Sequence, residues 1–323
     1  MPVKAAQVHQ LRCALLAWYD AHRRELPWRK GTDPYRVWVS EIMLQQTRVA
    51  AVLEHYARFI KRFPTVASLA SAREQSVLAA WSGLGYYHRA RRMHQAAKLI
   101  VRQRNGQFPF RFEEWLELPG VGRYTAAAIA SIAFGEPVAV VDGNVERVLA
   151  RVTGHALSNG SAWEPAQALL DPARPGDFNQ AMMELGATIC TPRAPKCLAC
   201  PVTAFCRTQG EQPSSGKAVR KRRQLCCALI ERNDAVLLVQ RPPDVKLMAG
   251  MWELPTVPQN PDHAEAIARL RHSITDTDYE VLVFRAPELR VANSSWFTPK
   301  QWQRAALTGL ARKILKKALT SPA

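Results

Sequence analysis

The stretch Leu118-Pro-Gly-Val-Gly-Arg-Tyr-Thr-Ala126 carries the pattern on which the expected fold depends. Gly120 and Gly122 flank a small hydrophobic residue, which favours a tight turn whose backbone N–H groups point outward. A helix predicted over residues 125–133 follows at once, and the N-terminus of a helix attracts an anion. The sequence therefore predicts a turn between two helices that can hold a phosphate group.

This turn resembles the helix-hairpin-helix element, which contacts a DNA phosphate without reading the base sequence. A generic glycine-rich turn between helices is the alternative. The chain carries 44 Lys and Arg against 27 Asp and Glu, a formal net charge of +17. That excess indicates a polyanionic partner, either nucleic acid or an anionic membrane surface, although a generally basic protein would show it too.

The chain has 323 residues, enough for two domains with separate cores. Up to residue 209, apolar residues recur at helical spacing between Pro and Gly breaks, most clearly at 49–59, 67–81 and 125–133. Residues 210–224 are expected to form a polar linker that ends in a basic run. The sequence therefore predicts an all-α first domain.

From residue 225 onward the pattern changes to short runs rich in Val and Leu, bounded by turn residues. These runs predict strands at 225–230, 235–240 and 279–284, and a closing helix at 307–319. The second domain is expected to be α+β.

Four cysteines stand in the spacing C-x6-C-x2-C-x5-C: Cys190, Cys197, Cys200 and Cys206. Four thiolates in one short stretch can close a shell around a metal centre, and cubane iron–sulfur clusters take four cysteines. A zinc site is the alternative, although zinc ligands usually come as two paired hooks and only Cys197 and Cys200 form one. Two disulfides are the third interpretation.

The expected compartment disfavours disulfides. The longest run of small apolar residues, 125–135, has 11 residues and is too short for a membrane span. The first 12 residues lack the apolar core of a signal peptide. We therefore expect a cytoplasmic protein without a membrane partner, in a reducing environment.

Two acidic residues are candidates for catalysis. Asp142 follows two apolar residues and precedes Gly143, which predicts a helix start where its carboxylate stays ionised. If residues 38–47 are helical, Val37, Glu41 and Leu44 share a face, and apolar surroundings raise a carboxyl pKa. A neutral acid beside an ionised aspartate is the pairing that cleaves glycosidic bonds. A simple N-cap aspartate and a paired structural glutamate are the alternatives.

The glycine-rich turn, Asp142 and the cysteine segment, in this order and spacing, resemble the endonuclease III superfamily of DNA glycosylases over residues 10–209. Within it, SEIMLQQT (40–47), GLGYY (83–87) and VDGN (141–144) are similar to the adenine DNA glycosylases of the MutY family, which remove adenine mispaired with 8-oxoguanine. Endonuclease III has a lysine nucleophile where this chain has Tyr124. A phenol cannot form a Schiff base, so the resemblance implies a glycosylase without an efficient lyase step.

The resemblance also implies roles for matching residues. Glu41 would protonate the leaving adenine and then help to activate water, while Asp142 would stabilise the cationic sugar, supported by Tyr124 and Asn144. The cysteines would hold a [4Fe-4S] cluster within segment 190–206. The other residues implied to contact DNA or the extruded adenine are Trp28, Arg29, Gln46, Thr47, Tyr86, Gly120 and Gly122. For Trp28 and Tyr86, plain core packing is the alternative.

The sequence GMWELP (250–255) resembles a turn of Nudix-like domains, as in the 8-oxoguanine-reading C-terminal domain of this family. Residues 261–271 lack the glutamate-rich helix that holds Mg²⁺ in a Nudix hydrolase, so this domain is expected to bind rather than hydrolyse. The loop expected to touch 8-oxoguanine has Thr275, which can donate a hydrogen bond. It has Asp276 where the family usually has histidine.

We therefore expect a multidomain protein: an all-α helix-hairpin-helix glycosylase domain with an iron–sulfur loop at 1–209, a linker at 210–224, and an α+β Nudix-like domain at 225–323. Its expected partner is double-stranded DNA with A:8-oxoguanine or A:G mispairs, which it would bind as a monomer. The rival interpretations are a lyase that acts on oxidised pyrimidines and a non-catalytic DNA-binding or iron–sulfur sensor protein.

Overall fold

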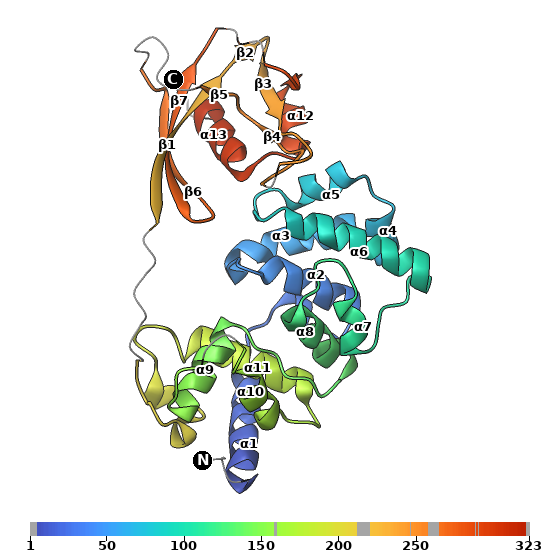
Figure 1. Cartoon of the computed structure of the whole chain (residues 1–323), viewed down its shortest axis with the longest axis vertical. Helices are drawn as coiled ribbons and strands as arrows, with labels where there is room; N and C mark the ends of the chain where they lie inside the picture. Colours follow the sequence, from blue (N-terminus) through green and yellow to red (C-terminus); the bar gives the residue numbers. More distant parts are fainter. Residues whose placement is uncertain are drawn as a thin grey trace. The chain divides into compact units, whose positions relative to one another are not determined.

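The computed structural model describes residues 5–157, 160–211, 220–245, 247–257, 265–287, 289 and 291–320. Within these ranges, every helix is too short or too polar to cross a bilayer. The chain divides into two compact units (Figure 1). Unit 1 comprises Met1–Ile60, Thr65–Ala67 and Gln95–Ser215, and unit 2 comprises Lys61–Pro64, Ser68–His94 and Gly216–Ala323.

The described residues before the predicted linker form helices and no strand, as the apolar periodicity predicts. In chain order the elements are α1 (Ala5–His22), η1 (Pro27–Arg29), α2 (Pro34–Leu44), α3 (Val49–Arg62), α4 (Val66–Ala70), α5 (Glu74–Trp81), α6 (His88–Arg104), α7 (Phe112–Leu116), α8 (Arg123–Phe134), α9 (Gly143–Thr153), α10 (Trp163–Leu169), α11 (Pro175–Thr188), η2 (Cys197–Ala199) and η3 (Thr203–Phe205).

Two predicted helix limits are wrong. The helix expected over 67–81 is two helices, α4 and α5, because Arg73 is extended (φ −68°, ψ 137°) and caps α5. The apolar spacing continues across this break and therefore did not reveal it. The helix expected over 38–47 ends at Leu44, since Gln45 leaves the helical region (φ −54°, ψ 117°) and Gln46 has a left-handed φ of 54°.

The glycine-rich stretch forms the predicted turn between α7 and α8. Gly120 has φ 80°, in the region that favours glycine, and Val121 donates its N–H to the Leu118 carbonyl at 3.1 Å. Gly122 is the N-cap residue of α8, with its backbone extended. The first N–H groups of α8 therefore follow directly on the turn.

The core of unit 1 gathers around α11. One cluster joins buried residues of α1, α9, α10 and α11, including Leu15, Leu149 and Phe178, and Cys190 and Cys200 pack against it. In Figure 1, α9, α10 and α11 lie beside α1. A second, smaller cluster packs α8 against the segment before α9. Cys190 and Cys200 thus sit on the same core as the helix that Asp142 begins.

Unit 2 contains two four-stranded sheets, in the orders β5-β1-β7-β6 and β2-β3-β4 with β8 paired to β3. Strands β1 and β7 are parallel, and the other named pairs are antiparallel. Helices α12 and α13 complete a core that draws on both sheets. The elements are β1 (Lys221–Leu229), β2 (Glu231–Arg232), β3 (Ala235–Gln240), β4 (Trp252–Glu253), β5 (Thr256–Val257), β6 (Ala268–Ile274), β7 (Thr277–Arg285), β8 (Ser294–Phe297), α12 (Pro299–Arg304) and α13 (Gly309–Thr320).

These elements confirm the α+β class predicted for the second domain. Strand β1 begins at Lys221, because it pairs with β7 from Thr277 onward, so the last four residues of the expected linker belong to a strand. Residues 212–219 of that linker lie outside the described residues. Unit 2 also contains the segment Ser68–His94, so the compact units divide the chain at other positions than the predicted domain limits.

Within unit 2, the loop between α5 and α6 is tied to the approach to α13. The Leu307 carbonyl accepts hydrogen bonds from Ser82 Oγ at 2.9 Å and Tyr87 Oη at 3.1 Å. Arg312 Nε in turn donates to Ser82 Oγ at 3.0 Å. This loop carries Tyr86, which is 42% exposed and has a left-handed φ of 47°. Hydrogen bonds on both sides of Tyr86 hold this uncommon backbone conformation.

Gly176→Ala is expected to destabilise unit 1. A Cβ at Gly176 on α11 would lie 2.6 Å from the Ser131 carbonyl oxygen of α8, and a backbone contact of that length forces the helices apart. The expected loss in the free energy of unfolding is about 1–3 kcal/mol. Urea unfolding measures it, with Gly31→Ala as the control because its Cβ would meet no atom within 4 Å. Equal effects of the two substitutions would contradict the prediction.

Candidate active site

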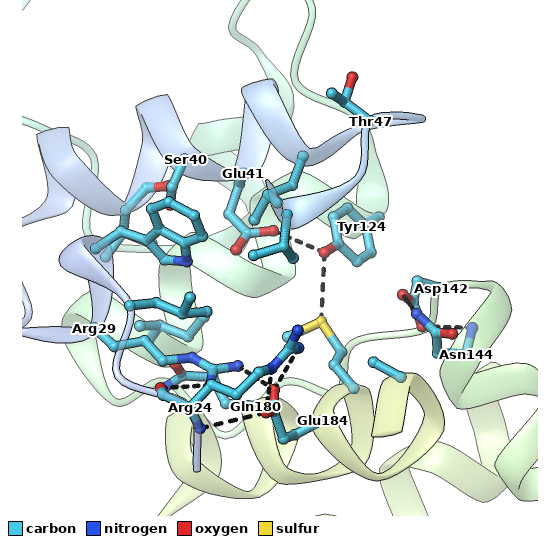
Figure 2. A pocket seen from close by; sticks show the side chains of 18 residues that line it. Arg24, Arg29, Ser40, Glu41, Thr47, Tyr124, Asp142, Asn144, Gln180 and Glu184 are labelled. Carbon is cyan, nitrogen blue, oxygen red and sulfur yellow. Dashed lines mark hydrogen bonds and ion pairs between the residues drawn. The ribbon is translucent and has the colours of Figure 1, made fainter. Parts of the chain in front are cut away.

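A pocket of about 180 Å³ opens in unit 1 (Figure 2). One water needs about 10–15 Å³ of such space, so the pocket accommodates a much larger ligand. Its walls come from η1, α2, α3, α8, α11 and the start of α9. The lining residues are Arg24, Leu26, Trp28, Arg29, Val37, Ser40, Glu41, Leu44, Thr47, Val49, Tyr124, Ile132, Asp142, Asn144, Gln180, Met183, Glu184 and Ala187.

Glu41 reaches the pocket from the buried face of α2. The helix begins at Asp33, whose carboxylate accepts hydrogen bonds from two backbone N–H groups of the first turn. Val37, Glu41 and Leu44 then line the same pocket, which confirms that they share one face. Glu41 is only 5% exposed, and Tyr124 Oη donates a hydrogen bond to its Oε2 at 2.7 Å.

Opposing influences place the pKa of the Glu41 carboxyl near neutral pH. Burial raises its pKa to about 7, the hydrogen bond from Tyr124 lowers it, the charge of Asp142 raises it, and Arg29 lowers it. Tyr124 itself has a pKa raised well above its usual value, by burial and by the neighbouring charges of Glu41 and Asp142. Tyr124 therefore remains a phenol, and Glu41 can hold a proton that it is able to donate.

Asp142 enters the pocket as the N-cap of α9. Its Oδ1 accepts hydrogen bonds from the backbone N–H groups of Asn144 at 2.9 Å and Val145 at 2.8 Å. The side-chain amide of Asn144 donates to Oδ2 at 2.9 Å. Three N–H groups and the positive end of the helix dipole stabilise a negative charge on this carboxylate. Figure 2 shows Asp142 and Asn144 on the α9 side of the pocket and Glu41 across it, beside Tyr124.

A buried ion-pair cluster forms another wall, and sequence reasoning missed two of its members. Glu184 is 1% exposed and accepts from Arg24 (Nε, 2.5 Å; Nη2, 2.8 Å) and Arg29 (Nη2, 3.0 Å). Burial by itself raises the pKa of Glu184, but the hydrogen bond from Arg24 and the charge of Arg29 outweigh it and lower that pKa. Arg24 and Glu184 are 160 positions apart, so no local pattern connects them. The available sequence signal was the spacing of Gln180 and Glu184, which lie at i and i+4 on α11 and therefore share one face of that helix.

Three comparisons with known proteins show what this chain is similar to. Residues 39–162 match the family described as HhH-GPD superfamily base excision DNA repair protein. The adenine DNA glycosylase of Homo sapiens is 42% identical, covering 79% of this chain and 59% of the human protein. That of Schizosaccharomyces pombe is 34% identical, covering 78% and 70%. A solved thermostable thymine-DNA glycosylase is 30% identical with a TM-score of 0.59, covering 63% of this chain and 97% of its own.

The chain belongs to the adenine DNA glycosylase family. It spans less than two thirds of the length of the human protein that it matches. The match to the HhH-GPD family begins within α2 and covers the glycine-rich turn and Asp142, so it includes Glu41 and Asp142 but not Glu184.

The structure brings together most of the residues that the family resemblance implies, but not all. Glu41, Tyr124, Asp142 and Asn144 line one pocket with Trp28, Arg29 and Thr47. Trp28 is buried at 6% exposure and contacts the Tyr56 ring edge to face at 5.2 Å between centroids, so it is both a packing residue and a pocket wall. Gly120 and Gly122 lie in the turn before α8.

Like Gly120 and Gly122, three further implied residues lie outside the pocket lining. Gln46 is exposed in the turn that follows α2. Tyr86 is exposed in unit 2, and Thr275 occupies the turn between β6 and β7 with a left-handed φ of 50°. Thr275 Oγ1 donates to Asp276 Oδ1 at 3.3 Å, so the residue at the usual histidine position is already engaged.

The cysteine segment packs beside α9. All seven cysteines are free. Burial raises the pKa of the Cys200 thiol, a backbone hydrogen bond from Val202 lowers it, and the charges of Cys190, Cys206 and Cys197 raise it further. Arg151 Nη1 donates to Cys190 Sγ at 3.2 Å, a contact that suits a thiolate ligand. Among the described residues, no three His, Cys, Asp or Glu side chains are arranged to hold a single metal ion.

An arginine on α9 connects this segment with the pocket. Arg147 Nε donates to the Cys190 carbonyl at 2.9 Å, and its Nη2 donates to Asn144 Oδ1 at 2.8 Å. Asn144 in turn bonds Asp142. The fold of the cysteine segment therefore bears on the orientation of Asn144.

Glu41→Gln is expected to stabilise the protein at alkaline pH. The folded-state pKa of about 7 exceeds the ordinary value of 4.5, so the unfolded chain loses this proton first and stability falls as pH rises through that window. The full effect is about 3 kcal/mol at pH 8 and disappears near pH 4.5. Urea unfolding at pH 5 and pH 8 measures it, with the exposed Glu54→Gln as the control. An unchanged pH slope in Glu41→Gln would refute the assignment.

Proposed function

We propose that this chain is an adenine DNA glycosylase that hydrolyses the N-glycosidic bond of adenine mispaired with 8-oxoguanine or guanine in double-stranded DNA. The observation that carries the proposal is the pairing of a buried Glu41, with a pKa of about 7, and the helix-capping carboxylate of Asp142 in one pocket. Family membership supports adenine as the nucleobase that is removed, because the curated relatives are named adenine DNA glycosylases.

The chemistry follows from these two groups. Protonated Glu41 donates its proton to N7 of adenine while the bond between the sugar C1′ and the base N9 breaks, and the bonding electrons leave with the base. The sugar becomes oxocarbenium-like, and the negative charge of Asp142 stabilises it where the positive charge develops. Water then attacks C1′ and gives its proton to the Glu41 carboxylate, which restores the starting state.

The remaining pocket residues suit an extruded purine. Adenine must leave the base stack to reach this chemistry. Trp28 and the aliphatic side chains of Val37 and Leu44 offer apolar walls for the ring faces. Arg29, held in place by Glu184, presents a donor to the polar edge of the base. Tyr124 provides no amine for a Schiff base, so the enzyme is monofunctional or only weakly active as a lyase.

The wider contacts with DNA complete the proposal. The turn at Gly120 and Gly122 and the N-terminus of α8 would hold a backbone phosphate, in keeping with the net charge of +17. Gln46, Thr47 and Tyr86 would fill the side of the damaged base. The Nudix-like domain, over 225–323 after a linker at 210–224, would contact 8-oxoguanine near Thr275. We propose that the domain of residues 1–209 and this second domain act within a monomer.

Adenine release from defined duplexes tests the function. Duplexes with A opposite 8-oxoguanine, A opposite G, and an oxidised pyrimidine opposite G are compared under single-turnover conditions. Adenine should be released from the first two, and Glu41→Gln or Asp142→Asn should slow release by about 10²–10⁴-fold. Glu54→Gln, an exposed acid on α3, is the matched control.

The same assay separates the rivals. Cleavage of the oxidised pyrimidine alone, with strong covalent trapping by borohydride, would show a lyase instead. If no duplex were cleaved and Glu41→Gln changed nothing, the chain would be a binding protein.

For the cofactor, we propose a [4Fe-4S] cluster held by Cys190, Cys197, Cys200 and Cys206. A bound cluster would brace the segment between the cysteines and present its exposed cations, such as Arg193 and Lys196, to DNA phosphates. The purified chain should contain about four irons and four inorganic sulfides. Cys197→Ala should lose most of both, whereas Cys13→Ala on α1 should keep them. Stoichiometric zinc without sulfide would overturn the assignment.

A further inference from the structure

The segment that leads into Asp142 belongs to no helix or strand. Residues 137–141 run from α8 to α9 and pair with no strand in the described part of the chain. Ala139 and Val140 are 2% and 1% exposed, so water does not reach their backbone. Buried N–H and carbonyl groups require partners, and these have to come from elsewhere.

Two side-chain amides supply those partners. Gln167 of α10 accepts from the Ala139 N–H at 2.8 Å and donates to the Pro137 carbonyl at 2.9 Å. Asn179 of α11 accepts from the Val140 N–H at 3.0 Å and donates to the Val138 carbonyl at 2.9 Å. Each amide thus bonds two residues that are two positions apart, as one residue of a parallel neighbouring strand does with its N–H and carbonyl groups.

The two amides come from different helices and hold alternating residues of the segment. Gln167 of α10 bonds residues 137 and 139, and Asn179 of α11 bonds residues 138 and 140. Such a clamp fixes the position of the segment along its length.

Asn179 is itself held in place. It is 3% exposed, and its Nδ2 also donates to Ser131 Oγ at 2.9 Å, while Ser131 Oγ donates to the Ala127 carbonyl at 2.7 Å. Helix α8, which carries Ser131, also carries Tyr124, and α11 carries Met183 one turn after Asn179. The clamp therefore ties Asp142 to the two helices that shape the opposite wall of the pocket.

We propose that Gln167 and Asn179 are positioning residues that take the place of neighbouring strands and set how far Asp142 extends toward Glu41. The inference rests on the proposed function for its effect on catalysis, but the clamp itself is testable without it. Gln167 lies at the surface and Asn179 is buried, so the pair offers a mild and a severe perturbation.

Single-turnover kinetics test the effect on chemistry. Gln167→Ala is expected to slow adenine release by about 10–100-fold, and Asn179→Ala by at least as much, because small displacements of a catalytic group are costly. The dissociation constant for the A:8-oxoguanine duplex should change by less than about threefold, since neither residue is assigned to DNA binding. Gln103→Ala, an exposed amide on α6, is the matched control.

The pH profile gives a reading that a loss of stability alone would not change. The groups that face Glu41 are Tyr124 from α8, Asp142 before α9 and Arg29 from η1, and the charge of Asp142 raises the Glu41 pKa. If Asp142 moves away, that pKa falls, and the alkaline limb of the rate profile shifts to lower pH. An unshifted limb with a normal rate in Gln167→Ala would overturn the proposal.

Amide hydrogen exchange tests the clamp independently of activity. Gln167→Ala should speed exchange at the Ala139 N–H, and Asn179→Ala should speed it at Val140, while the rest of α9 stays protected. Unchanged protection at both positions would refute the clamp even in an active enzyme. If the wild-type chain released no adenine, the proposed function would fail, and these exchange rates would still decide the structural part.

Discussion

The burial of one carboxyl group opposite another is the constraint on which this site depends. Glu41 lies where an ionised carboxylate is poorly solvated, and the charge of Asp142 makes its ionisation still harder. Tyr124 offsets part of that cost with a single hydrogen bond. Asp142 keeps its own charge stabilised because the N–H groups of α9 point at it. The two carboxyl groups thus differ in environment, and that difference suits Glu41 to act as the acid and Asp142 to act as the charged stabiliser.

Helix α11 arranges much of the pocket. It approaches α8 closely at Gly176 and α9 closely at Gly186, where an added Cβ would lie 2.6 Å from Asn144 Cβ. The same helix contributes Asn179, which holds the segment before Asp142, and Glu184, which forms ion pairs with two arginines. Its glycines allow the close approach, and its polar residues form hydrogen bonds and ion pairs with the neighbouring elements. A shift of this helix would therefore move both walls of the pocket.

The arginines of the site have different tasks. Arg24 and Arg29 neutralise Glu184 in a buried cluster, where removal of one partner would leave a charge without compensation. Arg147 and Arg151 instead bond the cysteine segment, through the Cys190 carbonyl and the Cys190 sulfur. The large positive charge of the chain is thus partly committed to internal structure. Only the exposed basic side chains that are not used in this way, such as Lys196, support the expectation that the chain binds DNA.

The sequence by itself determined the local features: the glycine-rich turn, the N-cap at Asp142, the face shared by Val37, Glu41 and Leu44, and the change from helices to strands. Each depends on neighbours within a few positions, which is the range over which periodicity and capping act. Only the tertiary structure decided that Glu184 joins the site and that Gln167 and Asn179 hold its approach. Those contacts link residues that are 28 to 160 positions apart in the sequence. No local pattern encodes which distant amide or carboxylate will bond a given buried polar group.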